Sequence, residues 1–198
     1  MIPGPLSILT ASTAVVALAE IGDKTMLLAI VLSARLRAPW QILAGIFFAT
    51  IANHALAAFV GQEVAGLLDA PWFRIAVALG FIAMAAWTLV PDKFDEDDEG
   101  FRHRGGPFLT TLVSFFLVEM GDKTQVATVA LGAQYHNVLL VATGTTLGMM
   151  LANGPAVFLG EELVKRVSLK ATRMAAALLF LVLGLWQLAA LAGWLGRL

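Results

Sequence analysis

The hexapeptide Glu20-Ile21-Gly22-Asp23-Lys24-Thr25 lies in the middle of a long apolar run, and it returns 99 residues later as Glu119-Met120-Gly121-Asp122-Lys123-Thr124. Each copy brings two carboxylates and one ammonium into a stretch that is long enough to span a bilayer. Charged groups at that depth are costly and rare, and they usually mark a functional site. The two copies therefore predict one polar site inside an apolar protein.

The composition is that of a membrane protein. The 198 residues are 59% hydrophobic and 14% charged, and the mean hydropathy is +0.83, whereas soluble domains are about 45–50% apolar and about 25% charged. The net charge of −1 gives no indication of a nucleic-acid partner, and the absence of cysteine excludes thiolate metal sites and disulfides. We expect the lipid bilayer as a partner and no cofactor.

Six stretches reach the roughly 20 mostly apolar residues that a spanning helix needs. They cover about 8–34, 40–61, 72–90, 108–133, 138–160 and 171–195. The predicted fold class is an all-α integral membrane protein with six transmembrane helices. Residues 1–90 form a first three-helix repeat, 91–106 a polar cytoplasmic loop, and 107–198 a second three-helix repeat.

The two halves are related in sequence. The offset of 99 that superposes the hexapeptides also pairs rarer residues, namely Glu63 with Glu162, Arg74 with Arg173, Phe81 with Phe180 and Trp87 with Trp186. This pattern indicates an internal duplication. Because each half has an odd number of crossings, the second enters the membrane from the opposite side, which predicts inverted repeats related by a pseudo-two-fold axis in the membrane plane.

The basic residues of the loops predict the orientation. One side carries Arg35, Arg37, Lys93, Arg102, Arg104, Lys165, Arg166, Lys170 and Arg173, and the other carries Arg74 and Arg197. Cytoplasmic loops are enriched in lysine and arginine. The first side is therefore expected in the cytoplasm, with both termini outside.

The four motif carboxylates are candidate metal ligands. Glu20 and Asp23 are three residues apart, as are Glu119 and Asp122, so within a helix each pair is expected on one face. Inverted repeats would bring all four together near the midplane. Four carboxylates offer enough oxygens for a hard divalent cation.

The formal charge of the site indicates what it could exchange. Each hexapeptide sums to −1, and the pair of −2 is neutralised by one divalent cation or by two protons, so neither loaded state leaves uncompensated charge. Each lysine follows its motif glutamate by four residues, the favourable order for an intrahelical pair. Lys24, Lys123, Thr25 and Thr124 are therefore expected to tune the site or to couple it to protons.

Other residues in the spans are weaker candidates. Gly22 and Gly121 would allow close helix approach or local unwinding. Four polar residues could line a cavity: Asn53, Gln125, Thr128 and Asn153. The two asparagines align at an offset of 100, so pairing them requires a one-residue slip. His54 is a lone histidine and is expected to be structural.

With both hexapeptides in view, the chain resembles the small transporters that carry two Glu-x-Gly-Asp-Lys/Arg-Thr/Ser signatures. That family includes the Golgi manganese/calcium transporters of eukaryotes and bacterial manganese exporters, within the lysine-exporter-like superfamily. The resemblance implies a proton-coupled Mn²⁺ and/or Ca²⁺ transporter in which the four motif carboxylates bind the cation. The compact chain looks like a bacterial member that exports manganese across the inner membrane. We expect alternating access about the central site.

Several alternatives remain open from the sequence. An amino-acid exporter is compatible with the superfamily, since Lys24 or Lys123 could bind a substrate carboxylate. An intramembrane aspartyl protease would use the two motif aspartates, but an adjacent lysine keeps an aspartate ionised and disfavours the shared-proton pair. A scaffolding protein could use each hexapeptide as a self-neutralised cluster. The oligomeric state is not predicted.

Overall fold

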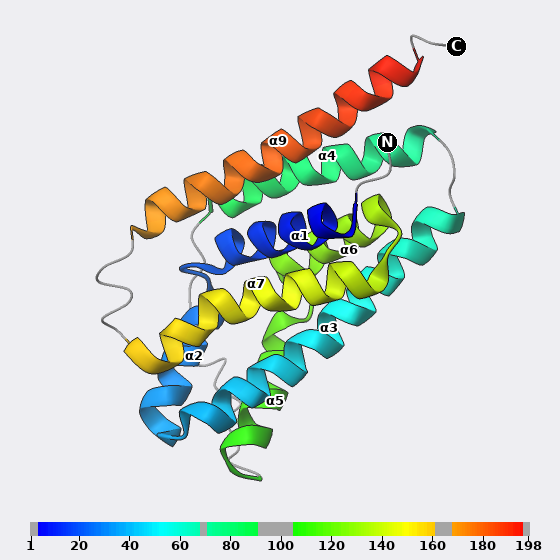
Figure 1. The fold of residues 1–198 in the computed structure, drawn as a ribbon. Coiled ribbons are helices and arrows are strands. Elements are labelled where there is room, and N and C mark those ends of the chain that lie inside the picture. The colour runs from blue at the N-terminus through cyan, green and yellow to red at the C-terminus, as the bar shows by residue number, and fades with distance from the viewer. Residues whose placement is uncertain (1–3, 68–70, 91–104, 161–167, 196–198) are drawn as a thin grey trace.

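The computed structural model describes residues 4–67, 71–90, 105–160 and 168–195, and this part of the chain is helical without any strand (Figure 1). The helices are α1 (Pro5–Glu20), α2 (Lys24–Leu36), α3 (Pro39–Leu67), α4 (Pro71–Thr88), α5 (Gly106–Glu119), α6 (Lys123–Tyr135), α7 (Val138–Leu159) and α9 (Leu169–Leu195). Residues 91–104 of the predicted polar loop lie outside the described residues, as do Lys165 and Arg166.

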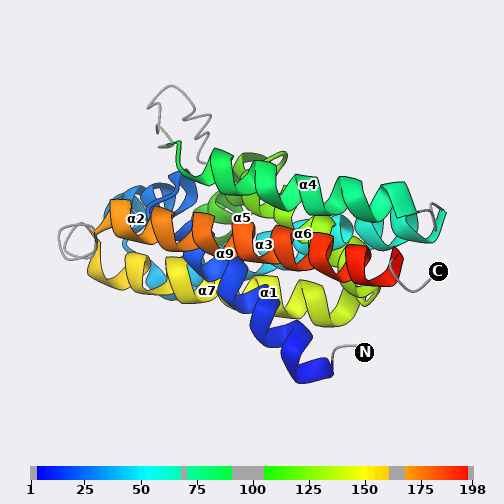
Figure 2. The same ribbon diagram turned by 90° about the horizontal axis from the view of Figure 1, so that it is seen from above.

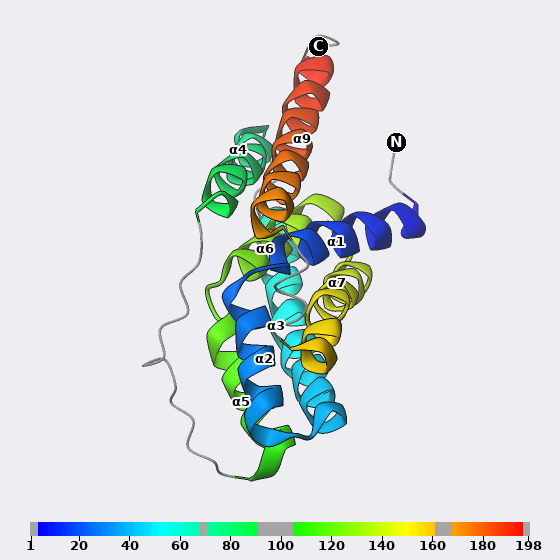
Figure 3. The same ribbon diagram turned by 90° about the vertical axis from the view of Figure 1, so that its left-hand side faces the viewer.

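Two predicted spans are broken at their hexapeptides. The first is divided into α1 and α2 and the fourth into α5 and α6, so the helical spacing expected for the motif carboxylates does not hold there. The cause is a glycine in each break, since Gly22 has φ 86° and Gly121 has φ 78°, values that glycine adopts without steric cost. Asp23 and Asp122 then occupy the N-cap positions of α2 and α6. Figure 3 shows α2 turning sharply away from the direction of α1.

The two halves of the chain are interleaved. Helix α3 packs against both parts of the second broken segment, α5 and α6, while α7 packs against α1 and α2 (Figure 2). Glycines allow these helices to approach closely, because a Cβ on Gly61 of α3 would lie 2.1 Å from the carbonyl oxygen of Val129, and one on Gly148 of α7 would lie 2.5 Å from that of Thr13. Each half therefore positions the broken helices of the other.

Helices α4 and α9 form a pair on one side of the molecule and run in opposite directions (Figure 1). Phe81 of α4 stacks on Phe180 of α9, with ring centroids 6.4 Å apart.

The ends of α2 and α6 resemble each other, since Arg37 and His136 both adopt left-handed backbone conformations with φ of 51° and 49°. The residues of this pair are 99 positions apart in the chain, as are Phe81 and Phe180.

The surface and the helix lengths fit a membrane protein. Among the described residues, three helical segments are long and apolar enough to cross a membrane, namely Pro39–Ala65, Val138–Leu159 and Lys170–Gly193, and shorter apolar helices cover Pro5–Glu20, Trp72–Thr88 and Gly106–Glu119. Large apolar side chains point outward, including Trp186 at 75% and Leu178 at 61% exposure. Such extended apolar surface is suited to contact with lipid.

Candidate metal centre

Three of the four motif carboxylates meet in the interior. Oxygens of Glu20, Asp23 and Asp122 lie within 4.8 Å of one another, and all three residues are buried. Glu20 ends α1, whereas the two aspartates are the N-cap residues immediately before α2 and α6. Oxygens bind Ca²⁺ at about 2.3–2.6 Å, so ligands on opposite sides of one ion are about 4.6–5.2 Å apart. The two hexapeptides thus contribute oxygens at the spacing of one cation site.

Glu20 is held by residues of α2 and α7. The Thr25 hydroxyl donates a hydrogen bond to Glu20 Oε2, and Asn153 Nδ2 lies 3.5 Å from the same oxygen. Asn153 Nδ2 also lies 3.2 Å from the Met149 carbonyl oxygen, one turn earlier in α7. The predicted residues Thr25 and Asn153 therefore orient the carboxylate that contributes to the three-oxygen group.

Glu119 lies beside this group, close enough for the charges of Asp23 and Asp122 to act on it. The Thr124 hydroxyl donates to Glu119 Oε2 over 3.1 Å, as Thr25 does to Glu20. His54 Nε2 lies 3.9 Å from the same oxygen, and both side chains are completely buried.

The contact between His54 and Glu119 was not expected from the sequence. His54 and Asn153 are separated by 99 residues, the offset of the hexapeptides, and each lies against the motif glutamate of the other half. The two asparagines at an offset of 100 are therefore not equivalent in position. Applying the offset to His54 itself would have revealed this relation.

Lys24 forms an ion pair with the other hexapeptide, where the spacing within one helix would have paired it with Glu20. Lys24 Nζ lies 2.9 Å from Asp122 Oδ1, with side-chain exposures of 30% and 4%, so the first hexapeptide is joined to the second by an ion pair. The helix break between Glu20 and Lys24 removes the spacing expected within one helix. Lys123 Nζ lies 3.4 Å from the carbonyl oxygen of Val90, just beyond the end of α4.

Three other predicted residues bond to backbone groups around the second break. Asn53 Nδ2 donates to the Phe116 carbonyl oxygen over 3.0 Å, which partners one of the carbonyls left over at the end of α5. Gln125 Oε1 accepts from the Gly121 amide over 2.6 Å, and the Thr128 hydroxyl donates to a carbonyl one turn earlier. These contacts support the shape of the broken helix.

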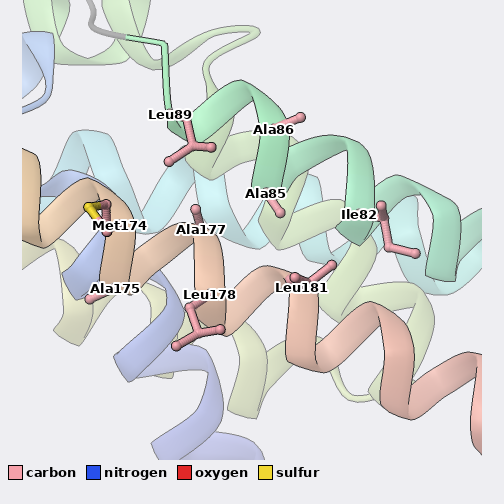
Figure 4. A pocket seen from close by; sticks show the side chains of 9 residues that line it. All are labelled: Ile82, Ala85, Ala86, Leu89, Met174, Ala175, Ala177, Leu178 and Leu181. Carbon is pink, nitrogen blue, oxygen red and sulfur yellow. The ribbon is translucent and has the colours of Figure 1, made fainter.

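A separate groove is unsuited to ions. It lies between α4 and α9 and has a volume of about 620 Å³. Its walls include Ile82, Ala85 and Leu89 from one helix and Ala177, Leu178 and Leu181 from the other (Figure 4). These side chains offer no donor or acceptor that could replace the hydration of a cation.

The buried carboxylates carry like charges that repel one another, and the ion pair of Lys24 with Asp122 offsets part of that repulsion. A charge removed from water is tolerated when an opposite charge accompanies it. A divalent cation among these oxygens would supply that charge, and so would protons on the carboxylates. The arrangement can therefore hold a divalent cation or protons.

An apolar helical protein with carboxylates gathered at paired helix breaks has the features of a membrane transport protein. The chain belongs to the family described as divalent cation/proton antiporter GDT1, whose pattern matches residues 8–96 and 107–193. It is therefore a transporter and not an enzyme, which confirms the resemblance and excludes the aspartyl protease.

Several relatives match over most of their length. A Vibrio cholerae protein named "Putative manganese exporter" is 48% identical over 181 residues, or 91% of this chain and 90% of that protein. GDT1-like protein 5 of Arabidopsis thaliana is 27% identical over 217 residues, which span 90% of this chain and 94% of that protein. GDT1-like protein sll0615 of Synechocystis is 27% identical over 194 residues, which span 88% of this chain and 93% of that protein. No solved structure matches this chain.

Proposed function

We propose that this protein exports Mn²⁺, with Ca²⁺ as the alternative ion, across the inner membrane of a bacterium in exchange for protons. The observation that carries the proposal is the group of buried oxygens from Glu20, Asp23 and Asp122, drawn from both hexapeptides. The family description supports exchange of a divalent cation for protons, and the name of the Vibrio cholerae relative favours manganese.

The donor atoms favour a hard ion. Carboxylate oxygens suit Mg²⁺, Ca²⁺ and Mn²⁺, whereas thiolates, which this chain lacks, favour Zn²⁺ and Cu⁺. In the proposed site Glu20, Asp23 and Asp122 bind the ion directly, and Glu119 completes the set. Thr25 and Thr124 orient the two glutamates through the hydrogen bonds described above.

Proton exchange follows from the balance of charge. The two hexapeptides sum to −2, so one divalent cation or two protons give a neutral site, and either neutral form can cross low-dielectric surroundings without an unpaired charge. The ion pair of Lys24 with Asp122 lies between the halves. We assign this ion pair the role of holding Asp122 in place while the site holds neither a cation nor the exchanged protons.

In the proposal, movement of the two repeats against each other opens the cation site to one side of the membrane and then to the other. We infer six crossings, with each broken segment as one crossing, arranged as inverted repeats over residues 1–90 and 107–198. The opposite directions of α4 and α9 (Figure 1) support this, as does the stacking of Phe81 on Phe180, since equivalent residues touch where a two-fold axis passes between them. In the proposed mechanism, the repeats rock about this axis. Both termini face outward.

The test is Mn²⁺ transport in everted membrane vesicles. Glu20→Gln and Asp122→Asn each remove a charge and a ligand while keeping the side-chain shape, and we expect each to reduce transport at least about tenfold. Glu63→Gln is the matched control, since Glu63 is exposed on α3 and should behave like the parent. Parental transport by either site variant would contradict the proposed site.

Proton release distinguishes an amino-acid exporter. In the proposal, adding Mn²⁺ to the purified protein in weakly buffered solution displaces protons from the carboxylates. A protein that carries amino acids would release none on addition of Mn²⁺. Release that persists in Asp122→Asn at the parental level would also count against the proposed ligands.

A further inference from the structure

We infer that His54 is a nitrogen ligand of the transported cation and that it makes the site prefer a transition-metal ion such as Mn²⁺ over Ca²⁺. The inference rests on the proposed function and assigns one more residue to the same site. It begins from a buried imidazole in the middle of α3, at a position where an apolar side chain would be expected in a membrane helix.

The surroundings of His54 do not account for its burial. Its side chain is 0% exposed, and neither ring nitrogen has a hydrogen-bond partner among the described residues. Buried polar groups are normally satisfied, and an exception requires an explanation such as a bound ion. The carboxylate of Glu119 lies nearby, with its Oε2 3.9 Å from His54 Nε2.

That distance suits two ligands of one ion better than it suits a hydrogen bond. Nitrogen–oxygen hydrogen bonds measure about 2.7–3.2 Å. Two donors bound to one metal at about 2.1–2.2 Å lie about 3.0–4.3 Å apart, depending on the angle between the two bonds. The distance between His54 and Glu119 is therefore compatible with a cation shared by the two side chains.

The repeat shows that this position belongs to the site. The residue equivalent to His54 is Asn153, whose Nδ2 lies 3.5 Å from Glu20 Oε2. Both positions thus face a motif glutamate from the helix packed against it, but one provides an amide and the other an imidazole. The two halves of the site consequently differ in donor chemistry.

An imidazole affects the choice of ion. Ca²⁺ takes oxygen ligands, whereas imidazole nitrogen binds transition metals well. An oxygen-only set cannot distinguish Mn²⁺ from Ca²⁺ by ligand softness. One nitrogen among the oxygens lowers the relative affinity for Ca²⁺, and His54 is the only histidine of the described residues that lies within an apolar span.

The test uses the paramagnetism of Mn²⁺. In electron spin-echo spectra of the purified full-length protein with bound Mn²⁺, we expect a nitrogen coupling that changes when the histidines are labelled with nitrogen-15. In His54→Asn, which installs the residue of the other half, the coupling should disappear. The Mn²⁺/Ca²⁺ affinity ratio should fall at least about tenfold, since even indirect partners of ligands are worth about 10–100-fold in affinity.

The control is His136→Asn, the same substitution at an exposed histidine that follows α6, which should leave both the coupling and the ratio unchanged. Bound Mn²⁺ without a nitrogen coupling in the parent would overturn the inference, even if His54→Asn fails to fold. That result would leave the carboxylate site intact. If the parent binds no Mn²⁺ at all, the proposed function and this inference both fail.

Discussion

Replacing Lys24 with methionine should make the site bind Mn²⁺ more tightly and export it more slowly. Lys24 Nζ lies 2.9 Å from Asp122 Oδ1, and Asp122 is only 4% exposed, so the ammonium competes directly with a cation for this oxygen. Methionine keeps the length of the side chain and removes its charge.

The size of the effect follows from the ion pair. A hydrogen bond to a charged group contributes about 1.5–3 kcal/mol, and the 30% exposure of Lys24 points to the lower end of that range because water screens the pair. A gain of about 1.5 kcal/mol corresponds to roughly tenfold tighter binding. The variant site has a formal charge of −3, and a charge of −1 remains when the ion is bound. Export slows because this uncompensated charge is costly in low-dielectric surroundings.

The assay is titration of Mn²⁺ into the detergent-purified protein, combined with initial rates of export in proteoliposomes. Lys170→Met is the matched control, and it should leave Mn²⁺ binding unchanged because Lys170 is exposed near the start of α9. Unchanged or weaker Mn²⁺ binding in Lys24→Met would refute this reasoning, as would an equal gain in both variants.

Three further predictions concern the helix contacts and the protons. Gly61→Leu should lower the melting temperature strongly, because its Cβ would lie 2.1 Å from the Val129 carbonyl oxygen, while Gly80→Ala, with no atom within 4 Å of its Cβ, should keep or raise it. Gly121→Ala should cost about 1–2 kcal/mol of stability through its φ of 78° alone, measured by chemical unfolding. Raising the pH on the outer side should slow Mn²⁺ export, since fewer protons are available to displace the ion; rates in proteoliposomes that are independent of outer pH would contradict proton coupling.

The composition and the apolar stretches predicted an all-helical membrane protein, and the hexapeptides within them predicted residues that gather in its interior. Charges within apolar runs are visible without any structure, and the offset of 99 was equally visible. Glu20, Asp23 and Asp122 come together as the paired motif indicated. The family resemblance was confirmed by the match over residues 8–96 and 107–193.

The local geometry was harder to predict because Gly22 and Gly121 were compatible with close helix approach or with local unwinding, while the spacing of the carboxylates was taken from a helix. Once the backbone leaves the helix at these glycines, residues on either side of the break no longer share a face. Lys24 consequently reaches Asp122 of the other hexapeptide. The position of His54 was missed for a different reason, since it was judged as an isolated residue and not through its equivalent, Asn153.

The central claim is that carboxylates of both hexapeptides bind one transported ion. Anomalous diffraction at the manganese edge, from crystals of the protein grown with Mn²⁺, tests it most directly. We predict a single strong peak within coordination distance of Glu20, Asp23 and Asp122, weakened in crystals to which Ca²⁺ is added in excess. A manganese peak only at other positions, with ordered carboxylates and no density among them, would contradict the account.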